Sequence, residues 1–170
     1  MYPDVESKLV EIKKIEDWMV SIPKGNISLR DDRKKERWNV DIEKFLLAKY
    51  PITQDLYLSV TSTNPSTFEG KNKPVESVSW YESIAFCNAL SDHNGFAKYY
   101  SVDFASETVE IIKEANGYRL PTDAEWEYAC RAGSSLVQYG LIDEISWFEG
   151  NSDGTTHEIG LKKTERFWTI

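Results

Sequence analysis

The stretch Asn-Gly-Tyr-Arg-Leu-Pro-Thr-Asp-Ala-Glu-Trp-Glu-Tyr-Ala-Cys-Arg-Ala-Gly, residues 116–133, decides the fold of this chain. It opens on Asn-Gly, a dipeptide typical of turns, and continues with a β-prone run over residues 118–120. Pro121 follows, and proline biases the residue before it toward extended geometry. The first part of the stretch therefore predicts a short strand that ends at Pro121.

The second part of the stretch has the signature of a capped helix. Thr122 stands at the N-cap position and Glu125 follows three residues later, so each side chain can accept a hydrogen bond from the backbone N–H of the other residue. This pattern predicts a helix over residues 123–132. Gly133 is suited to the left-handed conformation that closes such helices.

Length and composition indicate one globular domain. The chain has 170 residues, 41% of them hydrophobic and 13% aromatic, which is enough for a packed core. Its net charge of −8 argues against nucleic-acid or membrane partners, because an anion-binding surface needs clustered Lys and Arg. The mixed charge run at residues 30–37 is interpreted as a solvated loop. With no apolar run that could cross a bilayer and no secretory signal, we expect a cytoplasmic protein.

Residue spacing predicts the other elements of an α+β fold. Thr53 and Ser79 are candidate N-caps of helices over residues 54–61 and 80–91, and Glu82 completes a second capping box. We expect the second helix to bury a stripe made of Trp80, Ile84 and Cys87. Further predictions are an N-terminal helix at 5–15, strands at 18–22, 38–50, 74–80 and 146–148, and a β-hairpin of 99–102 with 109–112, although residues 106–115 also fit a helix.

The run Tyr-Arg-Leu-Pro-Thr-x-Ala-Glu-Trp-Glu-Tyr-Ala at 118–129 also resembles the central motif of the formylglycine-generating enzyme family, the sulfatase-modifying factors. Lys-Tyr-Pro-Ile-Thr-Gln-x-x-Tyr at 49–57 and Asn-Pro-Ser-x-Phe at 64–68 are similar to further segments of that family. The resemblance implies the irregular C-type-lectin-like fold of these enzymes, incomplete at the C-terminus. It divides the chain into an N-terminal helical extension (1–17), a partial family domain (18–163) and an unrelated tail (164–170).

The resemblance also implies a chemistry. Members of the family oxidise a substrate cysteine, in a sulfatase, to formylglycine with molecular oxygen on a copper ion held by two cysteines. That pair lies in a C-terminal region, with a Gly-Asn-x-Trp-Glu-Trp segment, that we do not find in this chain. Cys87 and Cys130 do not match the copper pair, and we interpret them as buried free thiols. We therefore expect no catalytic residue here, and copper only in a full-length product.

A calcium site is a further expectation from the resemblance. One family site uses a loop like Gly-Asn-Ser-Asp-Gly-Thr-Thr, here residues 150–156. Asn151, the carbonyl of Ser152 and Asp153 offer oxygen donors of the kind that calcium prefers, although the ion takes about six to eight of them. The alternative is an Asx-turn whose oxygen atoms bind the backbone amides of the loop itself.

The last seven residues, Thr-Glu-Arg-Phe-Trp-Thr-Ile, depart from the family, which usually continues here as Pro-Asn-x-Phe-Gly-Leu-Tyr-Asp. When their codons are read one base forward, the fifth codon must encode glycine, and the others allow the family's residues. Lys162 and Lys163 precede the tail, and their codons form an adenine-rich run that is prone to slippage. We therefore expect a frameshift after Lys163, which sequencing of the gene decides.

Three functional hypotheses remain open. The chain is a truncated and catalytically silent domain, a fragment of an enzyme that is active only as a full-frame product, or a non-enzymatic lectin-like module that binds a protein or a glycan. Its aromatic content fits all three. We also expect apolar surface to be exposed around Trp80, Trp126 and Trp147, with self-association as a consequence.

Overall fold

The computed structural model describes residues 15–103, 105–106, 108–134 and 140–163. The chain divides into two compact units, each built from two segments. Unit 1 combines Met1–Asp17 with Pro51–Leu120, and unit 2 combines Trp18–Tyr50 with Pro121–Ile170. Apart from Ile15, the predicted N-terminal helix lies outside the described residues, as does the predicted tail at 164–170.

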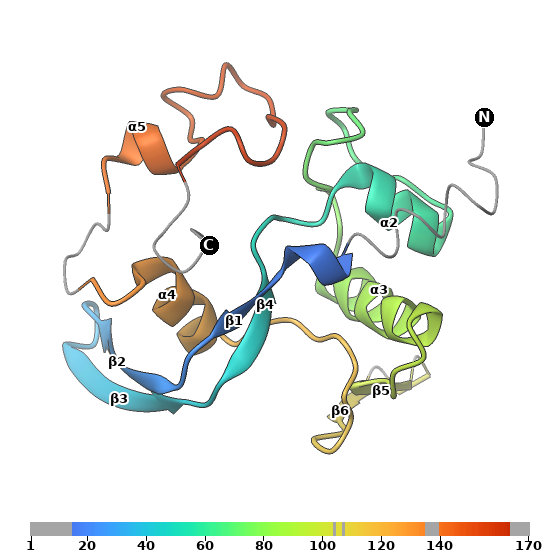
Figure 1. Ribbon diagram of the computed structural model, residues 1–170, viewed down its shortest axis with the longest axis horizontal. Coiled ribbons are helices and arrows are strands. Elements are labelled where there is room, and N and C mark those ends of the chain that lie inside the picture. Colours follow the sequence, from blue (N-terminus) through green and yellow to red (C-terminus); the bar gives the residue numbers. More distant parts are fainter. Residues whose placement is uncertain (1–14, 104, 107, 135–139, 164–170) are drawn as a thin grey trace. The chain divides into compact units, whose positions relative to one another are not determined.

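The described part of unit 1 consists of two packed helices and a β-hairpin (Figure 1). The helices are α2 (Gln54–Thr61) and α3 (Trp80–His93). The hairpin pairs β5 (Tyr100–Asp103) antiparallel with β6 (Thr108–Ile111). The predicted helices and hairpin are confirmed, and the alternative of a helix over residues 106–115 is wrong.

Side-chain caps explain where the two helices of unit 1 begin. Thr53 Oγ1 accepts the N–H of Leu56 at 3.3 Å. At α3, Ser79 Oγ accepts the N–H of Glu82 at 3.2 Å, and Glu82 Oε2 accepts the N–H of Ser79 at 2.7 Å. Each contact satisfies an N–H group that has no partner within its helix. The predicted caps are confirmed.

The core of unit 1 lies between α3 and the hairpin. Ile84, Cys87 and Tyr100 are buried there. Around them pack Tyr99, Val102, Val109, Tyr118 and Leu120. Trp80 is 53% exposed, so the prediction that it shares the buried stripe of α3 is wrong. A helical side chain leans toward the turn before its own Cα, and Trp80 is the first residue of its helix.

Two predicted strands of unit 1 are wrong. Residues 74–80 make only an isolated bridge, between Thr53 and Pro74, and Ser77 interrupts an extended path with a φ of 60°. The segment 118–120 joins no sheet because its N–H groups bind side chains. Tyr118 N donates to Ser91 Oγ at 2.8 Å, and Leu120 N donates to the hydroxyl of Tyr100 at 3.0 Å.

The described part of unit 2 contains two antiparallel strand pairs and two helices. β1 (Met19–Ile22) pairs with β4 (Phe45–Ala48), and β2 (Gly25–Asp31) pairs with β3 (Glu36–Ile42). α4 (Asp123–Arg131) packs against β2 and β3, which form the curved ribbon beside it in Figure 1. The short helix α5 (Ile142–Ile145) follows α4.

The core of unit 2 lies between α4 and the β2–β3 ribbon. Ile27, Ile42 and Ala124 are buried there, and the side chains packed around them are Leu29, Val40, Phe45 and Tyr128. Apolar residues alternate along both strands of the ribbon, as expected when one face of a sheet is buried. The single strand predicted at 38–50 is wrong, because β3 and β4 divide that segment and join different sheets.

The deciding stretch forms α4 as its pattern predicts. Glu125 Oε2 accepts the N–H of Thr122 at 2.8 Å, and Thr122 Oγ1 accepts the N–H of Glu125 at 3.2 Å. The helix closes with Ala132 and Gly133 in the left-handed region, at φ 46° and 81°. Over the part of the chain that the structure describes, each helix is too short or too polar to cross a bilayer.

Residues 30–37, interpreted as a solvated loop, are the ends of β2 and β3 with a tight turn between them. Asp31 Oδ1 accepts the N–H of Arg33 at 2.9 Å and that of Lys34 at 3.3 Å, an Asx-type arrangement that closes the turn. Lys35 completes the turn with a φ of 56°. The polar composition of residues 30–37 therefore did not reveal that the segment contains the ends of two paired strands. The turn between them is stabilised by the side chain of Asp31.

Candidate functional site

The residues predicted for calcium lie in the C-terminal loop cluster of unit 2, residues 141–163. The side chain of Asn151 holds this cluster together. Its Oδ1 accepts the N–H of Phe148 at 2.9 Å, and its Nδ2 donates to the carbonyl of Ser146 at 3.2 Å and to Asp143 Oδ1 at 3.3 Å. These contacts exclude the strand predicted at 146–148, which instead leads from the end of α5 into the turn.

The other two predicted calcium residues follow in the same turn. The carbonyl of Ser152 accepts the N–H of Thr155 at 3.1 Å and lies 3.0 Å from Nε2 of His157. Asp153 is exposed and has a φ of 51°, a conformation that Asp tolerates better than most residues. The sequence therefore located the turn, and the structure brings all three residues together in it.

This arrangement does not fit a calcium ion as it stands. The ion takes about six to eight oxygen donors. Here Asn151 Oδ1 and the carbonyl of Ser152 already accept hydrogen bonds from the loop itself, and the carboxylate of Asp153 faces solvent. The contacts are those of the alternative interpretation, a self-satisfied turn. Calcium binding stays a prediction that a calcium titration of the chain tests.

The indole of Trp147 contacts two side chains of the C-terminal loop cluster, those of His157 and Lys162. The imidazole of His157 stacks on it with ring centroids 3.8 Å apart, and Lys162 Nζ lies 3.7 Å from its centroid. Two groups this close to one ring must occupy opposite faces, because they would overlap on the same one. Lys162 Nζ also donates to the carbonyl of Asp143 at 2.6 Å. Trp147 therefore has neither face free for a ligand.

Replacing Asn151 by Ala is expected to loosen the C-terminal loop cluster. The N–H of Phe148 loses its acceptor and the carbonyl of Ser146 loses a donor, which costs about 1–2 kcal/mol of local stability. Amide hydrogen exchange over residues 146–155 measures this. Ser152→Ala is the control, because it keeps the Ser152 carbonyl; equal exchange rates in the two variants would contradict the role of Asn151.

The two cysteines occupy different surroundings, one in each unit. Cys87 on α3 is 6% exposed within the core of unit 1, and burial raises the pKa of its thiol to about 12. Cys130 lies on α4 and is half-buried. Neither forms a disulfide, as predicted. The predicted burial is confirmed for Cys87 and is wrong for Cys130, which is half-buried. Within the described ranges, no three His, Cys, Asp or Glu side chains gather as metal ligands would.

A second organised loop, residues 62–79 of unit 1, was not identified as a unit from the sequence. Gln54, which is 3% exposed, supports it from inside. Its Nε2 donates to the carbonyls of Phe68 and Pro74, at 2.9 and 3.2 Å, and its Oε1 accepts from Asn64 Nδ2 and the N–H of Gly70, at 3.1 and 3.0 Å. The sequence signals were the family-like runs at 49–57, which contains Gln54, and at 64–68.

The carboxylate of Glu76 stabilises this loop through three hydrogen bonds. It accepts the N–H of Phe68 at 2.9 Å, the N–H of Thr67 and the hydroxyl of Ser77 at 2.6 Å. These contacts, that from Ser77 foremost, lower the pKa of Glu76 below its ordinary value of 4.5. The loop 62–79 is thus held by one buried amide and one half-buried carboxylate.

We expect this loop to loosen in acid. Since the folded-state pKa of Glu76 is depressed, its contribution is fully present above the ordinary value of 4.5 and is lost as the pH falls through the lower folded value. The amide NMR signals of Thr67 and Phe68, followed from neutral pH downward, report the change. Glu76→Gln should remove this transition, and an unchanged transition in that variant would assign it to another group.

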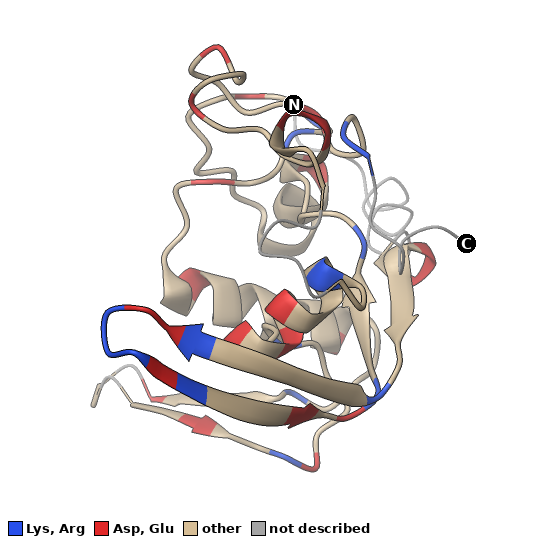
Figure 2. Cartoon of the chain, turned by 90° about the vertical axis from the view of Figure 1, so that its left-hand side faces the viewer, with Lys and Arg blue, Asp and Glu red and all other residues tan. Residues whose placement is uncertain are grey.

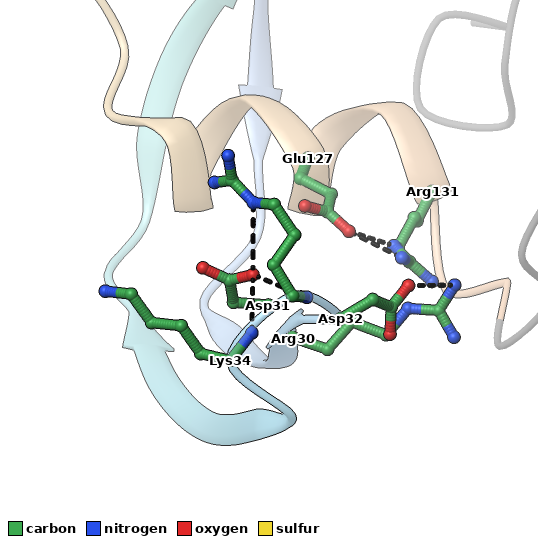
Figure 3. A network of polar contacts seen from close by, with 7 residues as sticks. Arg30, Asp31, Asp32, Lys34, Glu127 and Arg131 are labelled. Carbon is green, nitrogen blue, oxygen red and sulfur yellow. Dashed lines mark hydrogen bonds and ion pairs between the residues drawn. The ribbon is translucent and has the colours of Figure 1, made fainter.

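The turn of the β2–β3 hairpin carries both Lys or Arg and Asp or Glu side chains (Figure 2). Two of its cations lie close to neighbouring carboxylates: Arg30 pairs with Asp32 at 3.4 Å, and Arg33 lies 3.6 Å from Asp31 (Figure 3). On α4, Arg131 pairs with Glu127 one turn earlier. Such exposed pairs contribute little energy, and the turn mixes cations with carboxylates.

Aromatic side chains remain exposed in both units. In unit 1, Trp80 and Tyr81 are 53% and 40% exposed and contact each other edge to face, with centroids 5.2 Å apart. In unit 2, Trp126 is 55% and Trp147 38% exposed. The predicted exposure around Trp80, Trp126 and Trp147 is confirmed. Self-association stays a prediction.

Comparison with known proteins identifies the family. The family model described as sulfatase-modifying factor enzyme 1-like domain matches residues 6–158. The chain belongs to this family. A curated relative, chaperone protein LppX of Paenibacillus barcinonensis, is 37% identical over 132 residues, which cover 67% of this chain and 47% of the relative. The chain thus spans about half the length of that member of the sulfatase-modifying factor family.

Solved structures agree with the family assignment. Treponema denticola variable protein 1 superimposes with a TM-score of 0.81 at 28% identity, covering 88% of this chain and 67% of that one. CarF superimposes with a TM-score of 0.51 at 23% identity, covering 68% and 56%, and this likeness concerns the fold alone. The predicted α+β fold of the sulfatase-modifying factor type is confirmed.

Proposed function

We propose that this chain is a non-catalytic member of the sulfatase-modifying factor family that binds a protein partner. Under this proposal the exposed pair of Trp80 and Tyr81 contacts the partner. The family reaction, oxidation of a substrate cysteine to formylglycine, is not carried out by these residues. Because the chain spans about half of its curated relative, the proposal concerns this chain by itself.

The observation that carries the proposal is the environment of Cys87. Copper binds cysteine as thiolate, and a thiol with a pKa of about 12 stays protonated at neutral pH. Cys87 also packs against Ile84 and Tyr100, so a metal could reach it only if the core of unit 1 opened. The second cysteine, Cys130, lies in the other unit, on α4. This is the environment of a structural cysteine.

A protein is the partner class that the other observations favour. The relative LppX carries the name of a chaperone protein, and chaperones act on other proteins. Trp80 and Tyr81 present exposed aromatic area at a rigid helix start, and such side chains dominate protein interfaces at a low entropic cost. The chain's net charge of −8 is unfavourable for nucleic acid.

Suppression of protein aggregation tests the proposal. The full chain is mixed with citrate synthase during heating, and light scattering is recorded. We expect the chain to lower the scattering and Trp80→Ala to weaken this effect. Trp38→Ala, which removes an exposed tryptophan from β3 of unit 2, serves as control. If the wild-type chain leaves scattering unchanged but is retained on immobilised glycans, the lectin-like alternative replaces the proposal.

A further inference from the structure

The two outer edges of the β5–β6 hairpin differ. On the β5 side, the side chain of Asn88 on α3 forms hydrogen bonds with both main-chain polar groups of Tyr100. Its Nδ2 donates to the Tyr100 carbonyl at 2.7 Å, and its Oδ1 accepts the Tyr100 N–H at 3.2 Å. These are the two groups that a neighbouring strand would use. The edge of β5 is therefore closed at Tyr100.

The same contact fixes the hydrogen-bond pattern of the hairpin. Tyr100 lies opposite Ile111, and its N–H and C=O point to Asn88, so the two residues form a non-hydrogen-bonded pair. The next pair agrees, since Ile112 N donates to the carbonyl of Tyr99 at 2.9 Å. The main-chain groups of Ile111 must then point away from β5. Those of Val109 do the same, because the orientation repeats every second residue.

This outer edge of β6 is open. Among the residues that the structure describes, no hydrogen bond to the outward N–H or C=O of Val109 or Ile111 is found. An unpaired strand edge is a template on which another strand can add. Unit 1 thus covers one edge of its hairpin with an asparagine and leaves the other edge available.

The side chains along β6 define what could add there. Ile111 shares a face with Tyr100 and Val109, the face toward the core, yet it is 56% exposed. Ile112, the next residue, points to the opposite face and is 45% exposed. The opposite face carries Glu110. β5 and β6 together contain Asp103 and Glu110 and no Lys or Arg. The edge is apolar toward the core and acidic toward solvent.

We propose that β6 takes up an extended segment of a partner protein as a third strand of this hairpin. The segment has apolar side chains on the face of Ile111 and Lys or Arg on the face of Glu110. Its main chain binds the outward N–H and C=O groups of Val109 and Ile111. This inference rests on the proposed protein-binding function and names the kind of segment that is bound.

A synthetic peptide of alternating sequence, acetyl-Thr-Val-Lys-Ile-Lys-Val-Thr-amide, is the probe, labelled with fluorescein and titrated with the full chain. A peptide of the same composition in block order is the control. We expect Ile111→Pro to weaken binding about tenfold, because proline removes the outward N–H without touching the bonds to β5. Ile111→Thr keeps that N–H and should weaken binding only about twofold to threefold. Glu110→Lys should weaken binding about fivefold.

Hydrogen exchange on the wild-type chain keeps the test independent of how the variants fold. The amides of Val109 and Ile111 should exchange fast in the free chain and slow about tenfold when the peptide saturates it, whereas the inward amides of Glu110 and Ile112 should change little. Equal binding of the two peptides, equal affinity of Ile111→Pro and wild type, or slow exchange of Ile111 in the free chain would overturn the inference.

The same Ile111→Pro variant separates this inference from the proposed function. If it suppresses citrate synthase aggregation as well as wild type does, the β6 edge is not the binding site, although the binding function stands. If the wild-type chain neither suppresses aggregation nor binds the peptide, both proposals fail.

Discussion

Gln54→Ala is expected to release the loop 62–79 and to lower the stability of unit 1 by about 3 kcal/mol. The buried amide of Gln54 makes four hydrogen bonds to this loop, two as donor and two as acceptor. Its removal leaves the carbonyl of Phe68 and the N–H of Gly70 without those partners, and each unsatisfied buried group costs about 1–3 kcal/mol. A backbone hydrogen bond also joins Gln54 to this loop, since the N–H of Gln54 donates to the carbonyl of Lys73 at 3.0 Å.

Hydrogen exchange and urea unfolding measure this effect. In the variant, the amides of residues 64–74 should exchange faster than the inward, hydrogen-bonded amides of β5 and β6, because the loop depends on Gln54 and the hairpin does not. Lys71→Ala is the control, as it changes an exposed side chain of the same loop and keeps the main chain. A loss below about 1 kcal/mol would show that the loop holds itself without this amide.

Ile84→Ala is expected to cost about 3 kcal/mol or more, the range for removing a large buried aliphatic side chain. Ile84 is 0% exposed and packs with Cys87 and Tyr100 between α3 and the hairpin. The cavity faces a rigid helix and a two-stranded sheet, which limits how far the site can collapse. The amides of β5 should therefore lose protection together with those of α3.

Ile112→Ala gives the matched comparison, because the same atoms are removed from a side chain that is 45% exposed. Its effect should stay within about 0.5 kcal/mol. Urea unfolding followed by tryptophan fluorescence and by circular dichroism gives both values. Equal losses in the two variants would contradict the placement of the core of unit 1.

Local patterns were enough to predict the helices and the hairpin of unit 1. Thr53, Ser79 and Thr122 each form the predicted cap, because a cap is satisfied within one helical turn and needs no distant partner. The hairpin β5–β6 was also predicted from its alternation. The predictions that failed depended on contacts far along the sequence. The N–H groups of Tyr118 and Leu120 bind the side chains of Ser91 and Tyr100, which no local pattern predicts.

In the candidate sites, too, local features were predictable from the sequence and features that depend on distant contacts were not. The turn holding Asn151 was recognisable from its Asn-Ser-Asp-Gly sequence, but the stacking of His157 and Lys162 on Trp147 depends on how the loop closes. The exposure of Trp126 was predicted, whereas Trp80 had been placed both in the buried stripe of α3 and among the exposed side chains. The open edge of β6 was not predicted. The open edge of β6 follows from the hydrogen bonds between Asn88 and the main chain of Tyr100, twelve residues later, which set the pattern of the hairpin.

We propose that this chain binds a partner without carrying out the family's cysteine chemistry, and incubation with a cysteine-containing peptide is the direct test. The purified chain, copper(I) and the peptide are mixed in air at neutral pH, and the peptide is analysed by mass spectrometry. With Cys87 buried and its pKa raised to about 12, we expect the peptide cysteine to remain unconverted. Copper-dependent formation of formylglycine in the peptide would contradict the account.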